Sequence, residues 1–221
     1  MALNINGTTG ISGVDGSVSA PAVTGTDSTT GITFPSADSI KFSTGGVERM
    51  SITNSGVSGT GLGKILQVVQ AVKTDTASTT SGTYVTISGL SVNITPSATS
   101  SKILVIADVK AGNDGGNGYY LQIVRDSTAI YVGDAATGKQ QCIQQTYGGG
   151  DTGEGLYGMA KMGGTFLDSP NTTSQVTYAV QFLRLGGNSP QTLYVNRVGS
   201  ESAGQYVGRA ASSITAIEVA A

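Results

Sequence analysis

Carboxylic acids in the loops are the groups of this chain best suited to chemistry. Cleavage of a glycosidic bond needs two acids that flank it, and the loops offer Asp134, Asp151, Glu154, Asp168 and Glu201. No spacing in the sequence pairs any two of them, and a solvated surface acid is the simpler interpretation of each. We therefore expect no enzyme activity, and glycan depolymerase is the least favoured of three functional hypotheses.

Metal and nucleotide chemistry lack their usual ligands in this chain. It has no His and a single Cys, Cys142, so zinc sites lack ligands and this thiol lacks an imidazole base. A GxGxxG pattern at 148–153 follows no apolar strand and opens no helix, and 58–65 departs from the P-loop pattern at both ends. Turn chemistry explains the stretches rich in Gly, Asn and Asp better than calcium binding does. We expect no cofactor and no metal.

Tyrosine side chains in or beside the presumed loops are candidates for binding a sugar, since the ring offers a flat apolar face and the hydroxyl a hydrogen bond. The alternative for each is that it completes the core or an interface. The chain also has no Trp, which stacks well on sugar rings. With neighbouring acids included, we predict a distal binding surface formed by Tyr119, Asp134, Tyr147, Asp151, Glu154 and Tyr157.

The charge balance and the apolar runs exclude two classes of partner. The chain has 12 Lys and Arg against 14 Asp and Glu, whereas phosphate binding needs clustered cations, so we expect no nucleic-acid partner. The longest apolar run, Ile103–Ala107, is far shorter than the roughly 20 residues of a membrane helix. The first ten residues show no secretory pattern. We expect no membrane insertion and synthesis in the cytosol.

A change of composition near Gly59–Lys64 divides the chain in two. Residues 64–221 alternate strand-like runs with turn signals and contain no convincing helix, which predicts an antiparallel jelly-roll β-sandwich. The stretch Ala135–Phe166 is expected to form long loops with one or two irregular strands. The strands that we expect are Lys64–Lys73, Thr83–Ser88, Ser91–Thr95, Lys102–Lys110, Tyr119–Asp126, Thr128–Val132, Ser174–Leu185, Gln191–Val198 and Ser213–Ala220.

Two of these strands indicate how the sandwich is covered. Ser174–Leu185 has apolar residues at every second position, which is typical of a half-buried antiparallel strand. Ile103–Ala107 is apolar at successive positions, so we expect the core to cover one face of this strand and a neighbouring subunit the other. We predict that Ile103, Val105 and Tyr178 belong to this oligomer interface.

Residues 1–63 have too few large apolar side chains to close a core alone. Within them, Ser39–Thr44 and Val47–Thr53 alternate apolar and polar residues around Gly45-Gly46, a pair that suits the positive φ angles of a two-residue hairpin turn. Such a hairpin is too small to be stable by itself in water. We expect it to pack against other copies or against a host surface through Ile40, Phe42, Met50 and Ile52.

The segment Ser19–Arg49, SAPAVTGTDSTTGITFPSADSIKFSTGGVER, resembles the N-terminal region of tail-fibre-like and other virion surface proteins of tailed bacteriophages. The second part is similar to the domains that follow such leaders, in SSKILVIADVK at 100–110 and SSITAIEVAA at 212–221. The resemblance implies a homotrimer whose jelly roll is akin to the tumour-necrosis-factor-like fold. It also implies a location in the virion, after assembly in the host cytoplasm.

Two hypotheses follow for a non-enzymatic phage structural protein. In the first, the chain is a short trimeric tail fibre, with residues 1–63 as attachment or stalk segment and 64–221 as a head that adheres to a host-surface glycan or protein. In the second, it is a capsid decoration or cement protein, and residues 1–63 clamp neighbouring capsid subunits. Its other partners would be proteins of the tail, baseplate or capsid.

Overall fold

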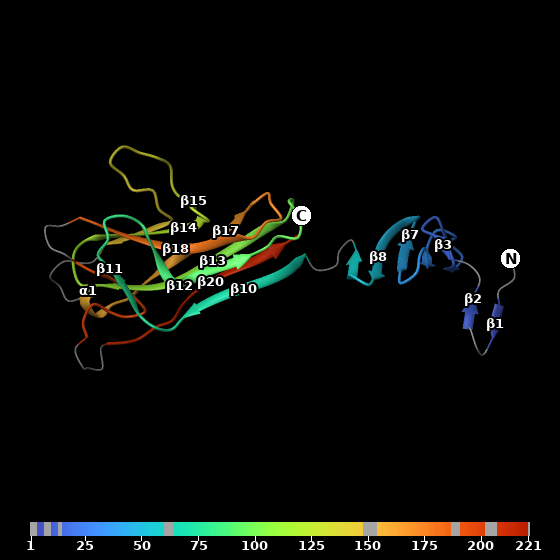
Figure 1. Cartoon of the computed structure of the whole chain (residues 1–221), viewed down its shortest axis with the longest axis horizontal. Coiled ribbons are helices and arrows are strands. Elements are labelled where there is room, and N and C mark those ends of the chain that lie inside the picture. Colours follow the sequence, from blue (N-terminus) through green and yellow to red (C-terminus); the bar gives the residue numbers. More distant parts are fainter. Residues whose placement is uncertain are drawn as a thin grey trace. The chain divides into compact units, whose positions relative to one another are not determined.

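The computed structural model describes residues 4–6, 10–12, 15–59, 64–147, 154–186, 191–201 and 207–220. The chain divides into two compact units, unit 1 at Met1–Gly63 and unit 2 at Lys64–Ala221. Every strand pairing in the described residues is antiparallel, and the one helix among them, α1 at Glu154–Tyr157, has 4 residues (Figure 1). The all-β fold expected from the sequence is confirmed.

Unit 1 is built around a five-stranded sheet in the order β5-β6-β7-β8-β9. Two short pairs, β1 with β2 and β3 with β4, precede it. The bounds are β1 Asn4–Asn6, β2 Gly10–Ser12, β3 Gly16–Ser17, β4 Ala20–Pro21, β5 Val23–Thr24, β6 Gly31–Thr33, β7 Ile40–Thr44, β8 Val47–Thr53 and β9 Gly56–Gly59.

The expected hairpin is present as β7 and β8. Gly45 and Gly46 join its strands with φ angles of 58° and 72°, and this left-handed backbone matches the twist of the two strands. The sequence did not reveal that β6 pairs with β7 and β9 with β8. The hairpin is therefore the centre of a larger sheet.

Unit 2 is a sandwich of two antiparallel sheets. Sheet A has the order β10-β20-β13-β19-β11, with β17 also paired to β13, and sheet B has the order β12-β18-β14-β15, with β16 also paired to β14. This arrangement is consistent with the expected jelly roll. The bounds are β10 Ile65–Lys73, β11 Ala77–Thr79, β12 Val85–Ile94, β13 Lys102–Asn113, β14 Gly118–Arg125, β15 Thr128–Ile130, β16 Gln144–Tyr147, β17 Ala160–Asp168, β18 Val176–Leu185, β19 Leu193–Val195 and β20 Ser212–Val219.

The core of unit 2 lies between the two sheets and takes every second residue of their strands. The alternation expected for β18 is confirmed, because its apolar face is buried in this core. The central strands contribute Val176, Tyr178, Val180 and Phe182 from β18, and Ile103, Val105, Ala107 and Val109 from β13.

The interface predicted from the sequence is wrong in its residues. Ile103, Val105 and Tyr178 are all 0% exposed within a single chain, so none of them can contact a neighbouring subunit. Because β13 is apolar on both faces, its inward face could not be identified from the apolar run alone. The structure turns Leu104 and Ile106, the alternate residues, away from the core.

Glycines explain two further differences from the expected strands. β12 is one strand where two were expected, and a register shift between Thr86 and Ser91 spans Gly89, whose φ is 84°. β17 lies mostly within Ala135–Phe166, where one or two irregular strands were expected among long loops, and it is a strand of 9 residues. A Cβ added at Gly163 would lie 1.9 Å from the carbonyl oxygen of Ala107 on β13, so this strand requires glycine there.

A buried carboxylate joins the two sheets. Asp168 of β17 in sheet A accepts hydrogen bonds of 2.6 Å from Arg125 Nη1 on β14 and from the hydroxyl of Tyr178 on β18, both in sheet B. Burial raises the pKa of Tyr178, and its bond to Asp168 raises it further. The three side chains therefore form one connected polar group at the edge of an apolar core.

Replacement of this carboxylate tests its importance. We expect Asp168→Ala to lower the free energy of unfolding of unit 2 by about 3–5 kcal/mol, because it leaves Arg125 without its partner. The matched variant Tyr178→Phe, which removes one hydrogen bond, should cost about 1–3 kcal/mol. All 9 Tyr lie in residues 64–221, so urea unfolding followed by tyrosine fluorescence reports on unit 2. Equal losses of unfolding free energy in the two variants would contradict the expectation that loss of the carboxylate costs more than loss of the hydroxyl.

Glu218 is a second buried acid, and its ionisation makes the stability of unit 2 depend on pH. Glu218 of β20 accepts hydrogen bonds from Ser97 N (2.7 Å), Ser97 Oγ (2.6 Å) and Gln67 Nε2 (2.6 Å). Burial alone would raise the pKa of Glu218, but these bonds outweigh it and lower the pKa to about 2. Since the pKa is lower in the folded state, the ionised group stabilises the fold above its unfolded pKa, and this contribution is lost as the pH falls.

We therefore expect wild-type unit 2 to be more stable than Glu218→Gln at neutral pH. The difference in free energy of unfolding should shrink between about pH 5 and about pH 2, as protonation removes the charge that the variant already lacks. Urea midpoints of both proteins across this range measure it. A difference that does not change with pH would show that the charge of Glu218 does not contribute to stability.

Candidate interaction surfaces

The outer face of sheet A carries an apolar row that crosses four strands. Val68 of β10 lies opposite Ile217 of β20, Ile217 opposite Leu104 of β13, and Leu104 opposite Leu167 of β17. The two ends of this outer row, Val68 and Leu167, are 57% and 50% exposed, although both are large apolar residues. A contiguous exposed apolar surface of this kind marks an interaction site.

Polar and apolar residues mix in the rows next to the outer row. The next row contains Gln70 and Thr215, joined by a 2.8 Å hydrogen bond from Gln70 Nε2 to Thr215 Oγ1. Beyond it, Asp108 forms ion pairs with Lys110 and Lys161. Apolar side chains continue past the outer row, because Ile106 lies in the row of Gln70 and Thr215 and Val72, 56% exposed, lies in the row of Asp108. This is the face that a second layer would cover in a fully buried sheet.

The five-stranded sheet of unit 1 is apolar on its open face and polar on its buried face. The buried side contains Thr33, Ser43 and Ser51, and Ser51 Oγ lies 2.9 Å from Ser58 Oγ. The other side carries two rows of cross-strand partners and is called here the unit 1 apolar face. Its rows are Val23, Ile32, Phe42 and Met50, and Ile40, Ile52 and Val57.

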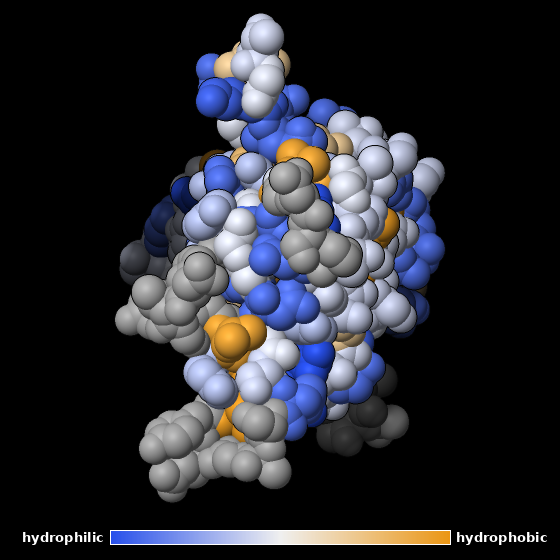
Figure 2. Space-filling model, turned by 90° about the vertical axis from the view of Figure 1, so that its left-hand side faces the viewer, coloured by the Kyte–Doolittle hydropathy of each residue, from blue (hydrophilic) through white to orange (hydrophobic). Residues whose placement is uncertain are grey.

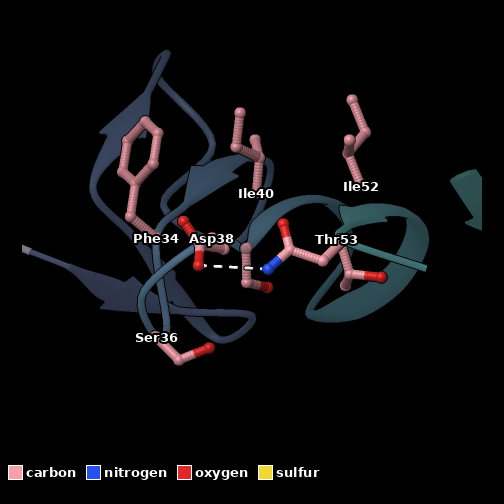
Figure 3. A pocket seen from close by; sticks show the side chains of 8 residues that line it. Phe34, Ser36, Asp38, Ile40, Ile52 and Thr53 are labelled. Atoms are coloured by element: carbon pink, nitrogen blue, oxygen red, sulfur yellow. Dashed lines mark hydrogen bonds between the residues drawn. The ribbon is translucent and has the colours of Figure 1, made fainter. Parts of the chain in front are cut away.

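A hollow of about 400 Å³ lies at one end of the unit 1 apolar face. Three of its lining side chains are apolar, Phe34, Ile40 and Ile52, and they point the same way in Figure 3. The other lining residues are polar: Ser36, Asp38, Ser39, Thr53 and Asn54. At its rim Asn54 Nδ2 donates a 3.1 Å hydrogen bond to Asp38 Oδ2, the bond that is dashed in the figure. The four residues predicted for the attachment hairpin, Ile40, Phe42, Met50 and Ile52, thus all lie on one face.

The residues predicted for the distal binding surface do not form one site. Tyr147, at the end of β16, and Tyr157, at the end of α1, are exposed, and α1 lies at the end of unit 2 opposite the start of β10 (Figure 1). Asp134 is exposed in the loop between β15 and β16. Glu154 is the first residue of α1, and Asp151 lies outside the described residues.

Tyr119 corrects this prediction, because it is fully buried in the core. Its hydroxyl donates a 3.0 Å hydrogen bond to the carbonyl oxygen of Gly115, and burial raises its pKa.

Hydrophilic and weakly polar residues cover most of the end of the molecule shown in Figure 2, with apolar residues in small, separate groups. That end can remain in water without a partner.

Two of the acids considered for glycosidic chemistry are bound in ion pairs. Asp168 is paired with Arg125, and Glu201 is paired with Arg209 and Arg197. In the described part of the chain no three acids, His or Cys are grouped as metal ligands. Cys142 is half-buried, and burial raises the pKa of its thiol.

No helix among the described residues has the length and apolarity to cross a membrane.

The residues of the outer row were missed by sequence reasoning, although a signal was present. Lys102, Asp108 and Lys110 share the parity of Leu104 and Ile106 along β13, and charged side chains rarely face a core. That parity identifies the outward face. Phe34 lies outside any alternating run, and no sequence signal connects it with the hairpin.

Comparisons with known proteins find remote structural likeness only. No protein-family model and no curated protein matches the chain. A mutant VP2 protein of infectious bursal disease virus, in derived T=1 particles, is 10% identical with a TM-score of 0.37, and covers 94% of this chain and 54% of that one. The Gt strain of the same virus gives 11% identity and a TM-score of 0.36, with 94% and 56% covered. The chain thus spans about half the length of these structures, and the likeness carries no functional argument.

Proposed function

We propose that this chain is a non-enzymatic structural protein of a bacteriophage virion, most simply a short trimeric tail fibre that adheres to the host surface. The observation that carries this proposal is that each unit leaves an apolar sheet face uncovered. Faces of this kind belong to subunits that assemble. The resemblance of Ser19–Arg49 to the leaders of phage virion proteins supports a virion as the assembly.

The two units suit different tasks in such a fibre. Unit 1 would attach the chain to the particle through its apolar face. Unit 2 would be the head, and its end with Tyr147 and Tyr157 would meet the host. In unit 2, Ala220 N donates a 2.7 Å hydrogen bond to the carbonyl oxygen of Lys64, so the chain enters and leaves this unit at one end. The opposite end of unit 2, with α1, is the end that we propose meets the receptor.

The outer row of sheet A is the surface through which we expect three heads to associate. Burial of Val68, Leu104 and Leu167 between copies would remove exposed apolar area from water. A trimer would also present three copies of the head at once. Weak binding at each head then becomes strong overall, because linked binding events are effectively intramolecular.

A capsid decoration protein is the second candidate, and one observation favours it. The hollow lined by Phe34, Ile40 and Ile52 lies in unit 1, the part that would clamp capsid subunits. In this function unit 1 binds the particle along its apolar face and the head only covers the surface. The two candidates differ in where the protein lies on the virion and in whether the head binds host cells.

Removal of unit 1 tests the proposed division of tasks. We expect a variant that lacks residues 1–63 to keep a folded unit 2, since the buried hydrophobic core cluster lies wholly in unit 2. It should no longer be incorporated into particles. Tyrosine fluorescence measures the fold, and immunogold labelling of purified particles measures incorporation and position.

Three outcomes of the labelling separate the hypotheses. Label at the tail together with binding of unit 2 to host cells supports the fibre. Label over the capsid without cell binding supports decoration. Incorporation of the shortened chain at the wild-type level would contradict the attachment role of unit 1.

The association of heads is tested by a charge placed in the outer row. We expect the wild-type protein to have a mass of three chains of 22.2 kDa in light scattering, and Leu167→Lys to shift it toward one chain, because a lysine buried without a partner is costly. Thr128→Lys, on exposed β15 of sheet B, is the matched control and should leave the mass unchanged. A wild-type monomer, or equal masses for all three proteins, would contradict association through this row.

A further inference from the structure

Two arginines of unit 2 hold one carboxylate between them. Arg209 Nη1 and Nη2 donate hydrogen bonds of 3.1 and 2.8 Å to the two carboxylate oxygens of Glu201. Arg197 forms an ion pair with Oε1 of the same carboxylate. Two parallel bonds from one guanidinium are the geometry with which arginine recognises a carboxylate. Glu201 therefore occupies a site for one carboxylate, called here the arginine cradle and formed by Arg197 and Arg209.

The fold positions both arginines of the cradle. Arg197 and Arg209 lie opposite each other in an isolated antiparallel bridge. The guanidinium carbon of Arg197 lies 3.7 Å from the centre of the Tyr194 ring, and the Tyr194 hydroxyl donates a 3.0 Å hydrogen bond to Asp114. The Arg197 side chain is only 15% exposed. Because stacking and burial already hold this guanidinium, it would lose little side-chain freedom when a ligand binds.

The arginine cradle lies at the α1 end of unit 2, away from the outer row. Ser200 N, beside Glu201 in the chain, donates a 3.0 Å hydrogen bond to the carbonyl oxygen of Leu156 in α1. Tyr194 lies opposite Gly112 of β13, which is about 26 Å along the strand from residue 104 of the outer row. The cradle is thus separate from the surface through which we expect heads to associate.

The exposure of the cradle suits exchange with an outside ligand. Arg209 and Glu201 are 55% and 51% exposed, so water screens this ion pair and it contributes little to stability. Within the cradle two guanidinium groups share a single carboxylate. An outside carboxylate can therefore replace that of Glu201 after a rotation of this one exposed side chain, and the sheets need not move.

The surroundings of the cradle favour a saccharide as the source of the carboxylate. Hydrophilic and weakly polar residues cover most of this end of unit 2 (Figure 2), and such residues suit the hydroxyl groups of a sugar. An acidic sugar presents one carboxylate among hydroxyls. An acidic peptide would bring several carboxylates together, which Asp114 and the displaced Glu201 would repel.

We propose that the arginine cradle binds the carboxylate of an acidic saccharide on the host surface, and that Glu201 is the internal group which this carboxylate displaces. The inference rests on the proposed function, because it gives the ligand class of the head that would meet the host. It also gives a specific site to the α1 end of unit 2, where the residues expected from the sequence do not form one.

Calorimetric titration of the full-length protein with a glucuronic acid oligosaccharide tests the cradle. The matched glucose oligosaccharide, which has no carboxylate, is the control ligand and should bind about tenfold more weakly or not at all. Arg209→Gln should weaken binding of the acidic oligosaccharide about tenfold, since it removes two charge-assisted hydrogen bonds. Lys64→Gln removes an exposed cation at the other end of unit 2 and should leave the affinity unchanged.

Glu201→Gln separates a binding cradle from a purely structural ion pair. Gln keeps the size of the side chain but lacks the charge that competes for the two guanidinium groups, so we expect the affinity for the acidic oligosaccharide to rise several-fold. A structural ion pair predicts no such gain. Failure of Glu201→Gln to bind the acidic oligosaccharide would overturn the inference, as would tighter binding of an oligo-aspartate peptide than of the saccharide.

Adhesion to host cells distinguishes failure of this inference from failure of the proposed function. We expect Arg209→Gln to reduce binding of the protein to host cells several-fold, while Lys64→Gln binds as the wild type does. Wild-type adhesion of Arg209→Gln would overturn the cradle alone and leave the fibre function standing. Absence of adhesion by the wild-type protein would instead contradict the fibre function on which the inference rests.

Discussion

Strand β13 is the element on which unit 2 depends, because it pairs on both edges and is apolar on both faces. It hydrogen-bonds to β20, β17 and β19, and it places five residues in the core. A strand with this environment cannot shift its register by one residue without exposing the core set and burying Lys102 and Asp108. The charged residues on its outer face thus select one register, while Leu104 and Ile106 between them lie on a face of sheet A that has no second layer.

The sandwich combines an apolar interior with a few polar contacts that connect the sheets. Asp168 joins β17 to β14 and β18, and Glu218 holds Ser97 in the loop after β12. Hydrogen bonds of this kind depend on the direction between their partners, so they fix the relative positions of the connected elements, which apolar packing alone does not. Unit 1 has the opposite distribution, with hydroxyl groups inside and apolar side chains outside. The two units therefore present apolar surface for the same physical reason, the lack of a second layer.

The fold of this chain was predictable where side chains alternate and where glycine has its usual place in a turn. The alternation of β18 and the Gly45-Gly46 hairpin are confirmed for this reason. One or two irregular strands were expected within Ala135–Phe166, but the bounds of β17 could not be given. Gly163 and Gly164 interrupt its pattern, and the need for glycine beside Ala107 arises from a strand about 55 residues away. The placement of Ile103 failed because the parity of the charged residues of β13 was not used to find its outward face, and that of Tyr119 failed because burial of a tyrosine depends on the whole sheet. The surface role of the remaining candidate residues stays a prediction.

The hydrogen bond between Ala220 and Lys64 has a consequence for how this molecule can change over time. It connects the start of β10 with the end of β20 at one end of unit 2. The turns at the opposite end are therefore not needed to hold these two strands together. Loops there can vary in length and sequence at little cost to the scaffold. Sequence changes at that end can therefore accumulate while the two sheets remain the same, which is the separation between framework and variable region that antibody domains also use.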